Sequence, residues 1–150
     1  MATSKVGSGG LTRKQIEAMF VRRQEALDNL DAAALSSDYA EDCVVESPAA
    51  GTLQGAWAVD NQRRAWFEAF PDLKYRTERL VIDGDTVVQI LILEGTDIGG
   101  FMGLPPSGKA FRVPAVYTYE LNGAKIMREQ RVYDFTGVLV QIGTLKAKPA

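Results

Sequence analysis

Histidine is absent from this 150-residue chain. Its absence excludes the Ser-His-Asp triad, the Cys-His pair and the common zinc sites that use imidazole ligands. The glycine-rich stretch "GTDIGGFMGLPPSGK" matches neither the G-x-x-x-x-G-K-[ST] phosphate loop nor the dinucleotide fingerprint. Any chemistry must therefore rest on carboxylates, tyrosines, amides or water, and we expect neither a metal nor an organic cofactor.

Cysteine is nearly as scarce, and long apolar runs are missing. The one cysteine, Cys43, cannot form an internal disulfide, which suits a reducing cytoplasm. Its apolar neighbours in "EDCVVES" predict a small buried residue. No stretch approaches the roughly 20 apolar residues of a membrane span. The opening "MATSKVGSGG" lacks the apolar core of a secretory signal, so we expect residues 1–10 to form a flexible N-terminus.

An excess of positive charge is also missing. Seventeen basic and 19 acidic residues give a formal net charge of −2, which disfavours a nucleic acid or an anionic membrane as partner. A chain of 150 residues can form one domain with a sizeable core. We expect this single domain to span 11–146, ahead of a short tail at 147–150.

The first half of the chain carries helical signals. Thr12 and Gln15 have the spacing of a capping box, and apolar residues follow at helical intervals. A second, short helix is expected to open at Asp31 and to run through "AAALSSDYA". A third is expected over about 57–70, where Pro71 ends it.

The second half changes to strand periodicity. A brief strand, "CVVES", and a loop, "AAGTLQG", precede four longer strand-like runs, "LKYRTERLVI", "TVVQILILEG", "AFRVPAVYTYEL" and "AKIMREQRVYDF". Asp83-Gly84 and Asn122-Gly123 indicate tight hairpins. Helices followed by such a sheet predict an α+β fold. We expect a curved, cone-shaped antiparallel or mixed sheet, with three N-terminal helices enclosing a pocket.

Asp134 is the first candidate for chemistry. It lies in what reads as the last strand, on the same face as Val132 and opposite Arg131. If Val132 faces inward, Asp134 points into the pocket, where desolvation would raise the pKa of its carboxyl and suit it to acid/base work. The alternative is a solvated acid at a strand end. Arg131, as a guanidinium beside a carboxylate, could hold an oxyanion, but its place on the opposite face favours an external or subunit-interface salt bridge.

Two further carboxylates could reach the same pocket. Asp97 shares a strand face with Leu91 and Leu93, although it could instead cap a turn after "EGT". Glu46 ends the "CVVES" strand and could enter from below or stay on the surface. Several large side chains could line an apolar pocket, although such residues more often belong to the core: Trp57, Trp66, Phe67, Phe70, Phe101, Met102 and Phe111.

Three stretches carry a resemblance to a known family. "WFEAFPDL" is similar to an aromatic-x-x-x-Phe-Pro-Asp helix ending. "EGTDIGGFMGLPPSGK" is similar to a Gly-Thr-x-x-Gly…Gly-x-Pro-Pro-x-Gly-Lys loop, and "KIMREQRVYDFTGVLVQIG" to an ending in Asp-x-x-x-Leu-x-x-Gln-hydrophobic-Gly. In order and spacing, from about residue 12 to 145, the sequence resembles the SnoaL-like polyketide cyclase (ester cyclase) family. That family has the nuclear-transport-factor-2-like cone.

The resemblance implies an acid/base role for Asp134, the aspartate ahead of the Leu-x-x-Gln ending. Characterised cyclases of the family close the ring of an aromatic polyketide ester by intramolecular aldol chemistry, without metal or cofactor. Relatives of the cone isomerise steroids, hydrolyse epoxides or take part in hydroxylation. Two departures stand out: many members have histidine where this chain has Asp97, and a Glu-x-Trp pattern where it reads "REQRVYD". A carboxylate at Asp97 cannot act as an imidazole does, but a protonated Asp97 near Asp134 could donate a hydrogen bond.

These observations predict a cofactor-independent enzyme of the kind used in antibiotic biosynthesis. It would act on an apolar, oxygenated polyketide-type molecule by aldol-type ring closure or a related isomerisation, with Asp134 as acid/base and Asp97 as its partner. Epoxide hydrolase- or hydroxylase-like chemistry and a non-catalytic ligand-binding module of the same fold are the alternatives. A homodimer formed through the sheet faces is expected from the resemblance. The expected substrate-binding residues are Glu46, Trp57, Trp66, Phe70, Gln89, Phe101, Met102 and Gln130.

Overall fold

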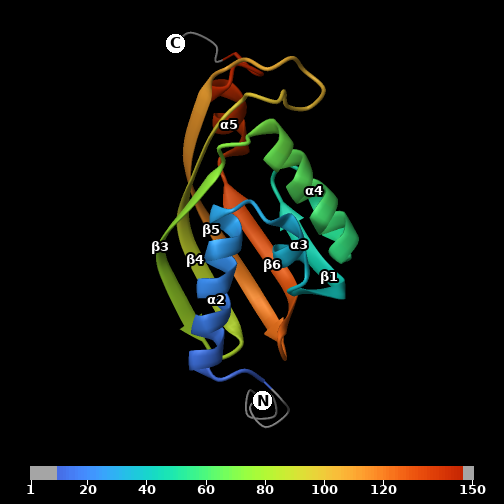
Figure 1. Cartoon of the computed structure of the whole chain (residues 1–150), viewed down its shortest axis with the longest axis vertical. Helices are drawn as coiled ribbons and strands as arrows, with labels where there is room; N and C mark the ends of the chain where they lie inside the picture. The colour runs from blue at the N-terminus through green and yellow to red at the C-terminus, as the bar shows by residue number, and fades with distance from the viewer. Residues whose placement is uncertain (1–9, 147–150) are drawn as a thin grey trace.

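A curved, six-stranded mixed sheet forms the body of this α+β protein (Figure 1). The structure, a computed structural model, describes residues 10–146, so the expected tail and all but Gly10 of the expected flexible N-terminus lie outside the described residues. The strands are β1 (Tyr39–Ser47), β2 (Gly51–Gln54), β3 (Lys74–Asp83), β4 (Thr86–Thr96), β5 (Ala110–Asn122) and β6 (Lys125–Tyr133). The helices are α2 (Arg13–Asp28), α3 (Ala32–Ser36), α4 (Ala56–Ala69) and α5 (Phe135–Gln141).

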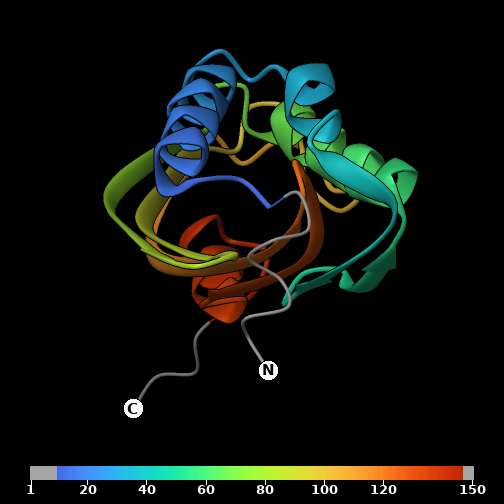
Figure 2. The same ribbon diagram turned by 90° about the horizontal axis from the view of Figure 1, so that it is seen from below.

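The strand order is β2-β1-β6-β5-β4-β3, and every neighbouring pair is antiparallel except β1 with β6, which is parallel. Figure 2 shows the sheet curling below α2, α3 and α4, which cover its open side. The core lies between these helices and the concave face. The predicted α+β class and the curved mixed sheet are confirmed.

The three N-terminal helices begin where the sequence signals predict. Thr12 Oγ1 accepts from the Gln15 amide at 3.2 Å, and Gln15 Oε1 accepts from the Thr12 amide at 2.8 Å, which completes the capping box of α2. Asp31 caps α3 by accepting from the Ala34 amide at 3.1 Å. The helix is shorter than predicted, because β1 already begins at Tyr39.

Both predicted hairpins are present. Asp83 pairs with Thr86, and Asn122 pairs with Lys125, so each turn has two residues and starts with glycine. Gly84 and Gly123 have φ values of +59° and +60°, a left-handed conformation in which a side chain would be strained.

Two predicted elements are wrong. The expected loop "AAGTLQG" contains β2, which pairs with the end of β1. The expected last strand ends at Tyr133, and α5 follows it. Strand β5 pairs with β6 from Ala115 to its end at Asn122. Along the first residues of β5, before Ala115, helix α5 takes the place of β6. There, Gln141 Oε1 accepts from the Arg112 amide at 2.8 Å. Helix α5 therefore caps an otherwise unpaired edge of β5.

The inward face of β6 is also the opposite of the predicted one. Val132 is 54% exposed, whereas Glu129 and Arg131 are 3% and 7% exposed. The sequence prediction placed the apolar residue inside and the ions outside. In the folded protein the two ions are buried together, because each supplies the counter-charge that the other needs.

Other features of the core agree with the sequence. Cys43 is fully buried, as predicted.

Within residues 10–146, no helix is both long and apolar enough to cross a membrane.

Candidate active site

A cavity of about 600 Å³ opens between α4, the loop after β4 and the start of α5. Its aromatic wall consists of Trp66, Phe101 and Phe135. The Trp66 ring centroid lies 5.3 Å from that of Phe101 and 6.3 Å from that of Phe135. We call this cavity the mouth. Its size and apolar wall suit a small organic molecule with rings.

Asp97 builds the loop that forms one side of the mouth. Its side chain is 3% exposed, and its two oxygens accept from the amides of Gly100 at 3.1 Å and Ser107 at 3.0 Å. The amides of Ile98 and Gly99 donate to the Ala69 carbonyl at 3.2 and 3.0 Å, which joins the loop to the end of α4. A Cβ at Gly99 would lie 2.0 Å from the Glu68 carbonyl oxygen, so this approach requires glycine.

A second, narrow cavity lies deeper inside the cone. Its volume is about 10 Å³, close to the space of one water molecule. It shares Gln62 and Trp66 with the mouth, so the two cavities adjoin. The rest of the lining consists of Leu93 of β4 and of polar side chains from four other elements: Arg63 of α4, Tyr75 of β3, Tyr117 of β5, and Arg131 and Tyr133 of β6.

Charged and phenolic groups at this inner cavity form one hydrogen-bonded cluster. Arg131 Nε donates to Glu129 Oε2 at 2.6 Å, and Arg131 Nη1 donates to Gln62 Oε1 at 2.9 Å. The Tyr39 hydroxyl donates to Glu129 Oε1, and it accepts from Arg63 Nη2 at 3.1 Å. Glu129 is therefore held by hydrogen bonds on both oxygens. We call Tyr39, Arg63, Glu129 and Arg131 the inner cluster.

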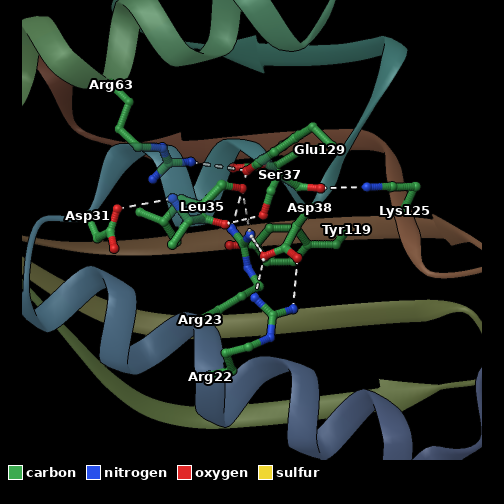
Figure 3. Close-up of polar contacts among 12 residues, drawn as sticks. Arg22, Arg23, Asp31, Leu35, Ser37, Asp38, Arg63, Tyr119, Lys125 and Glu129 are labelled. Carbon is green, nitrogen blue, oxygen red and sulfur yellow. Dashed lines mark hydrogen bonds and ion pairs between the residues drawn. The ribbon is translucent and has the colours of Figure 1, made fainter.

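Tyr39 also connects the inner cluster to a second ionic group. Figure 3 shows Arg22 and Arg23 of α2 converging on Asp38. Arg23 Nη1 donates to Asp38 Oδ2 at 2.9 Å, and Arg23 Nη2 donates to the Tyr39 hydroxyl at 3.3 Å. Both arginines are paired with Asp38. Arg23 is buried, whereas the side chain of Arg22 is half-exposed and lies on the solvent side of the pair. The cone is thus crossed by a continuous polar network. Arg63 and Arg131 line the inner cavity, and Arg23 lines a separate cavity of about 250 Å³ between α2 and the sheet.

Two N–H groups of the inner cluster are unpaired. Among the described residues, the Nε of Arg63 and the Nη2 of Arg131 are buried and find no hydrogen-bond partner. A buried donor without an acceptor is costly, and native proteins rarely tolerate one without a reason. Both arginines line the inner cavity, so an oxygen placed there could accept from them.

The ionisation states follow from the surroundings. Burial opposes the charge on Glu129, but Arg131 and Arg63, together with hydrogen bonds from Arg131 and Tyr39, outweigh it and hold the pKa of Glu129 below its ordinary value. Burial also opposes the charge on Arg131, yet Glu129 and neighbouring phenols raise the pKa of Arg131 well above its usual range. Burial raises the pKa of Tyr117 and of Tyr133, so both phenols stay neutral. The site combines fixed cations with neutral donors.

The structure places the predicted carboxylates outside the two cavities. Asp134 is exposed, and its Oδ1 accepts from the Gly137 amide at 2.8 Å as the N-cap of α5, so its predicted sequestration in an apolar pocket is wrong. Glu46 is also wrongly predicted to face inward: its side chain is 47% exposed, and it pairs with Arg128 at 3.8 Å on the outer face. Asp97 supports the loop as described above, which is the alternative interpretation of that residue.

The predicted binding residues divide into two groups. Trp66, Phe101 and Met102 line the mouth, and Phe70 packs behind them in the core. Besides Glu46, three do not reach it: Trp57 is 77% exposed on the first turn of α4, and Gln130 lies exposed on the outer face. Gln89 is buried elsewhere, accepting from the Tyr119 hydroxyl at 2.5 Å.

The sequence analysis missed the inner cluster. One feature of the sequence could have revealed it. Glu129, Arg131 and Tyr133 occupy alternate positions of β6, so they share one face of the strand, and Tyr117 and Tyr119 share a face of the adjacent strand in the same way. Within the described part of the chain, no group of three or more Cys, Asp or Glu side chains is placed to hold a metal ion.

Comparisons with known proteins agree with this architecture. The family model described as SnoaL-like polyketide cyclase matches residues 18–142. AclR from Streptomyces galilaeus, provisionally described as a hydroxylase, superposes with a TM-score of 0.79 at 22% identity, covering 92% of this chain and 87% of its own. No curated protein sequence matches the chain.

Two further solved structures share the fold. IdmH from Streptomyces antibioticus, provisionally described as a polyketide cyclase, has a TM-score of 0.72 at 23% identity, over 85% of this chain and 97% of its own. A Catenulispora acidiphila protein described as having a ketosteroid isomerase-like fold, in complex with trimethylamine, has a TM-score of 0.71 at 20% identity, over 87% and 96%. At these identities the structures establish the fold alone.

Proposed function

The chain belongs to the SnoaL-like polyketide cyclase family, and we propose that it catalyses the cofactor-independent ring closure, or a related isomerisation, of a polyketide-type molecule. The mouth would hold the aromatic part of the substrate against Trp66, Phe101 and Phe135. One carbonyl oxygen would reach the inner cavity. The observation that carries this proposal is the pair of unpartnered, buried guanidinium N–H groups where the aromatic-walled cavity ends.

The chemistry follows from the charge at that end. When a proton leaves the carbon beside a carbonyl, negative charge develops on the carbonyl oxygen, and fixed cations and neutral donors in a dry site stabilise that charge. Arg63 and Arg131 are such cations, and Tyr117 and Tyr133 are such donors. The enolate carbon then attacks a second carbonyl of the same chain, and a mouth that holds the chain folded favours this step.

Proton removal is assigned to Glu129. It is the carboxylate of the inner cluster, and the lowered pKa keeps it ionised, as a base must be. Glu129 does not itself line either cavity but is hydrogen-bonded to Arg131, which does, so one of its oxygens would have to exchange its present partner for the substrate proton. A weakly basic carboxylate suffices where the enolate oxygen is strongly stabilised, as in ketosteroid isomerase, whose base has only a modestly raised pKa. After the new carbon–carbon bond forms, the second carbonyl oxygen takes the proton back from Glu129, so no external reagent is needed.

A direct test follows enolisation and closure separately. An aromatic β-keto ester is incubated with the protein in D₂O, mass spectrometry reports the exchange of the α-hydrogen, and chromatography reports ring closure. Arg131→Gln should slow the exchange by roughly 10²–10³-fold, the usual cost of one oxyanion donor. Arg128→Gln, on the outer face of the same strand, should change nothing. Equal rates in both variants would exclude the assigned role of Arg131.

A non-catalytic ligand-binding module is the second candidate, and one observation favours it. The pKa of Glu129 lies below its ordinary value, whereas acid/base carboxyls of enzymes usually titrate above theirs. Wild-type protein that binds aromatic ligands without accelerating exchange would establish this alternative. An epoxide hydrolase-like reaction would call for an Asp-Arg-Asp group in the cavity. Among the described residues, Arg131 is paired with Glu129 and Arg63 donates to the Tyr39 hydroxyl, so neither arginine is hydrogen-bonded to an aspartate.

We also infer that two copies associate through the outer face of the sheet. Val132, Val116 and Ile90 lie side by side across β6, β5 and β4 on that face. Val132 is 54% exposed, and the other two are half-buried. Such a row of apolar side chains on a sheet suits burial against an identical row, as in a two-fold dimer.

A further inference from the structure

The charge of the inner cavity is not balanced by the groups around it. Arg63 and Arg131 are 4% and 7% exposed, and both line the cavity. Arg131 is paired with Glu129, whereas Arg63 donates to the neutral Tyr39 hydroxyl. Within residues 10–146, two positive charges therefore share one hydrogen-bonded carboxylate at this cavity. Two aspartates nearby do not correct the balance, because each is already paired: Asp38 with Arg22 and Arg23, and Asp60, whose charge also acts on Arg63, with Arg64.

The acceptors at this site are also in use. Both Glu129 oxygens accept hydrogen bonds, from Tyr39 and from Arg131. The Gln62 carbonyl oxygen accepts from Arg131 Nη1 at 2.9 Å. The remaining polar groups on the cavity wall are the phenols of Tyr75, Tyr117 and Tyr133. Their oxygens can accept hydrogen bonds, but burial raises the pKa of each, so they stay neutral and supply no negative charge. Among residues 10–146, two guanidinium N–H groups are left without an acceptor, and both arginines line a cavity that could take a further one.

We propose that the molecule bound at this site carries a carboxylate, so that the substrate is an aromatic polyketide acid rather than its neutral ester. This rests on the proposed function, because it concerns the same mouth and inner cluster. A carboxylate oxygen supplies both the missing negative charge and the missing acceptor. The carboxylate would lie where the mouth adjoins the inner cavity, within reach of the same cations as the reacting carbonyl oxygen, and the rings would stay in the mouth against Trp66, Phe101 and Phe135.

The test compares two ligands that differ only in charge. 2-Naphthoate and methyl 2-naphthoate have the same ring system, and neither can cyclise. Calorimetry should give a dissociation constant at least about tenfold lower for the acid, the usual advantage of a charge-assisted hydrogen bond. Because the chain has two tryptophans, ¹⁵N-labelled Trp57→Phe protein has one indole signal, from Trp66, and that signal should shift when the acid binds.

Three variants distinguish recognition of a carboxylate by the inner cluster from an effect of the overall charge of the protein. Glu129→Gln removes the opposing charge and should tighten acid binding severalfold while leaving the ester unchanged. Because a loss of folding would weaken binding, it could not produce this increase in affinity for the acid. Arg131→Gln should bring acid and ester to similar affinity. Arg128→Gln loses the same charge on the outer face, where the side chain is 55% exposed, and should retain the preference for the acid.

The outcomes distinguish the two proposals. Equal binding of acid and ester by the wild type, or no gain in Glu129→Gln, would overturn the carboxylate assignment and leave ring closure of an ester intact. A strong acid preference in a protein that accelerates no α-hydrogen exchange would support the carboxylate assignment and remove the enzymatic one. Binding that does not shift the Trp66 indole signal would place the ligand outside the mouth and contradict the carboxylate assignment.

Discussion

Arg131 donates from Nε to Glu129 Oε2 at 2.6 Å, and the two side chains are 6% and 0% exposed on the inner face of β6. Residues two apart on a strand point to the same side, so this pair fixes which face of β6 is inside. A buried ion pair contributes little net stability compared with apolar residues of the same shape. Removing one partner is expensive, however, because the other charge stays buried.

Arg131→Met should therefore lower the free energy of unfolding by about 3–5 kcal/mol, the usual cost of breaking a buried pair. Urea denaturation measures it. Glu129→Gln/Arg131→Met, which removes both charges, should be less destabilised than the sum of the single variants. Arg128→Met, on the exposed face, should stay within about 0.5 kcal/mol of the wild type. Additive single effects would show that the pair is not energetically coupled.

The same pair predicts a dependence of stability on pH. Although burial opposes its ionisation, Glu129 has a folded pKa below its ordinary value of 4.5, because the cations around it prevail. As the pH falls, the unfolded chain takes up this proton first, so the stability from Glu129 is complete above about pH 4.5 and is lost as the pH falls through the folded pKa. Urea midpoints between pH 7 and 3 should fall further for the wild type than for Glu129→Gln. Parallel curves would contradict the assignment.

Local signals made much of the fold predictable. The capping box of Thr12 and Gln15, the glycine turns and the Pro71 stop are short-range features, and each is present where it was expected. Helix α5 was missed because "YDFTGVLVQIG" is rich in β-branched and apolar residues, and only its contact with the edge of β5 decides for a helix. The parallel pairing of β1 with β6 joins segments about 85 residues apart, for which the sequence has no local signal.

The candidate site was less predictable, for a physical reason. Trp66, Phe101 and Met102 were found because large side chains near a predicted pocket are visible in a pattern. Glu129 and Arg131 were missed because burial of an ion is favourable only when its partners, Tyr39 from β1 and Arg63 from α4, arrive from distant parts of the chain. Alternation alone left two orientations of β6, and hydrophobicity favoured the wrong one.

Variants of Asp134 test whether this residue caps a helix, as in the structure, or acts as the acid/base, as the family resemblance implies. It caps α5 through the Gly137 amide at 2.8 Å. Asp134→Ala should therefore lower the free energy of unfolding by about 1 kcal/mol, and Asp134→Asn, which can still cap, should change it little. Because the side chain lies outside both cavities, α-hydrogen exchange should continue at the wild-type rate in Asp134→Asn and stop in Glu129→Gln. The reverse pattern would restore the acid/base role that the family resemblance implies for Asp134.

Asp97 should act on the mouth through its loop. An asparagine there keeps one acceptor oxygen but presents N–H groups to an amide that needs an acceptor, either Gly100 or Ser107. Asp97→Asn should lose about 1–3 kcal/mol of stability and expose the amides of residues 98–109 to faster hydrogen exchange. The affinity of the mouth for a ligand should fall together with the order of this loop, while hydrogen exchange of the β6 amides stays slow. Unchanged loop protection in Asp97→Asn would show that these two hydrogen bonds do not hold the loop.

Val132 tests the inferred dimer. It is 54% exposed and lies beside Val116 on the outer face, two residues from Asp134 and away from both cavities. A glutamate at position 132 would place a charge within the proposed contact, where two-fold symmetry would bring in a second copy of it. Light scattering should therefore give a dimer for the wild type and a monomer for Val132→Glu. Gln130→Glu adds the same charge one step along the exposed face, at the margin of the apolar row, and should weaken the dimer less. A wild-type protein that is monomeric at high concentration would remove the dimer, and the aromatic mouth and inner cluster would be unaffected, because one chain supplies all of their residues.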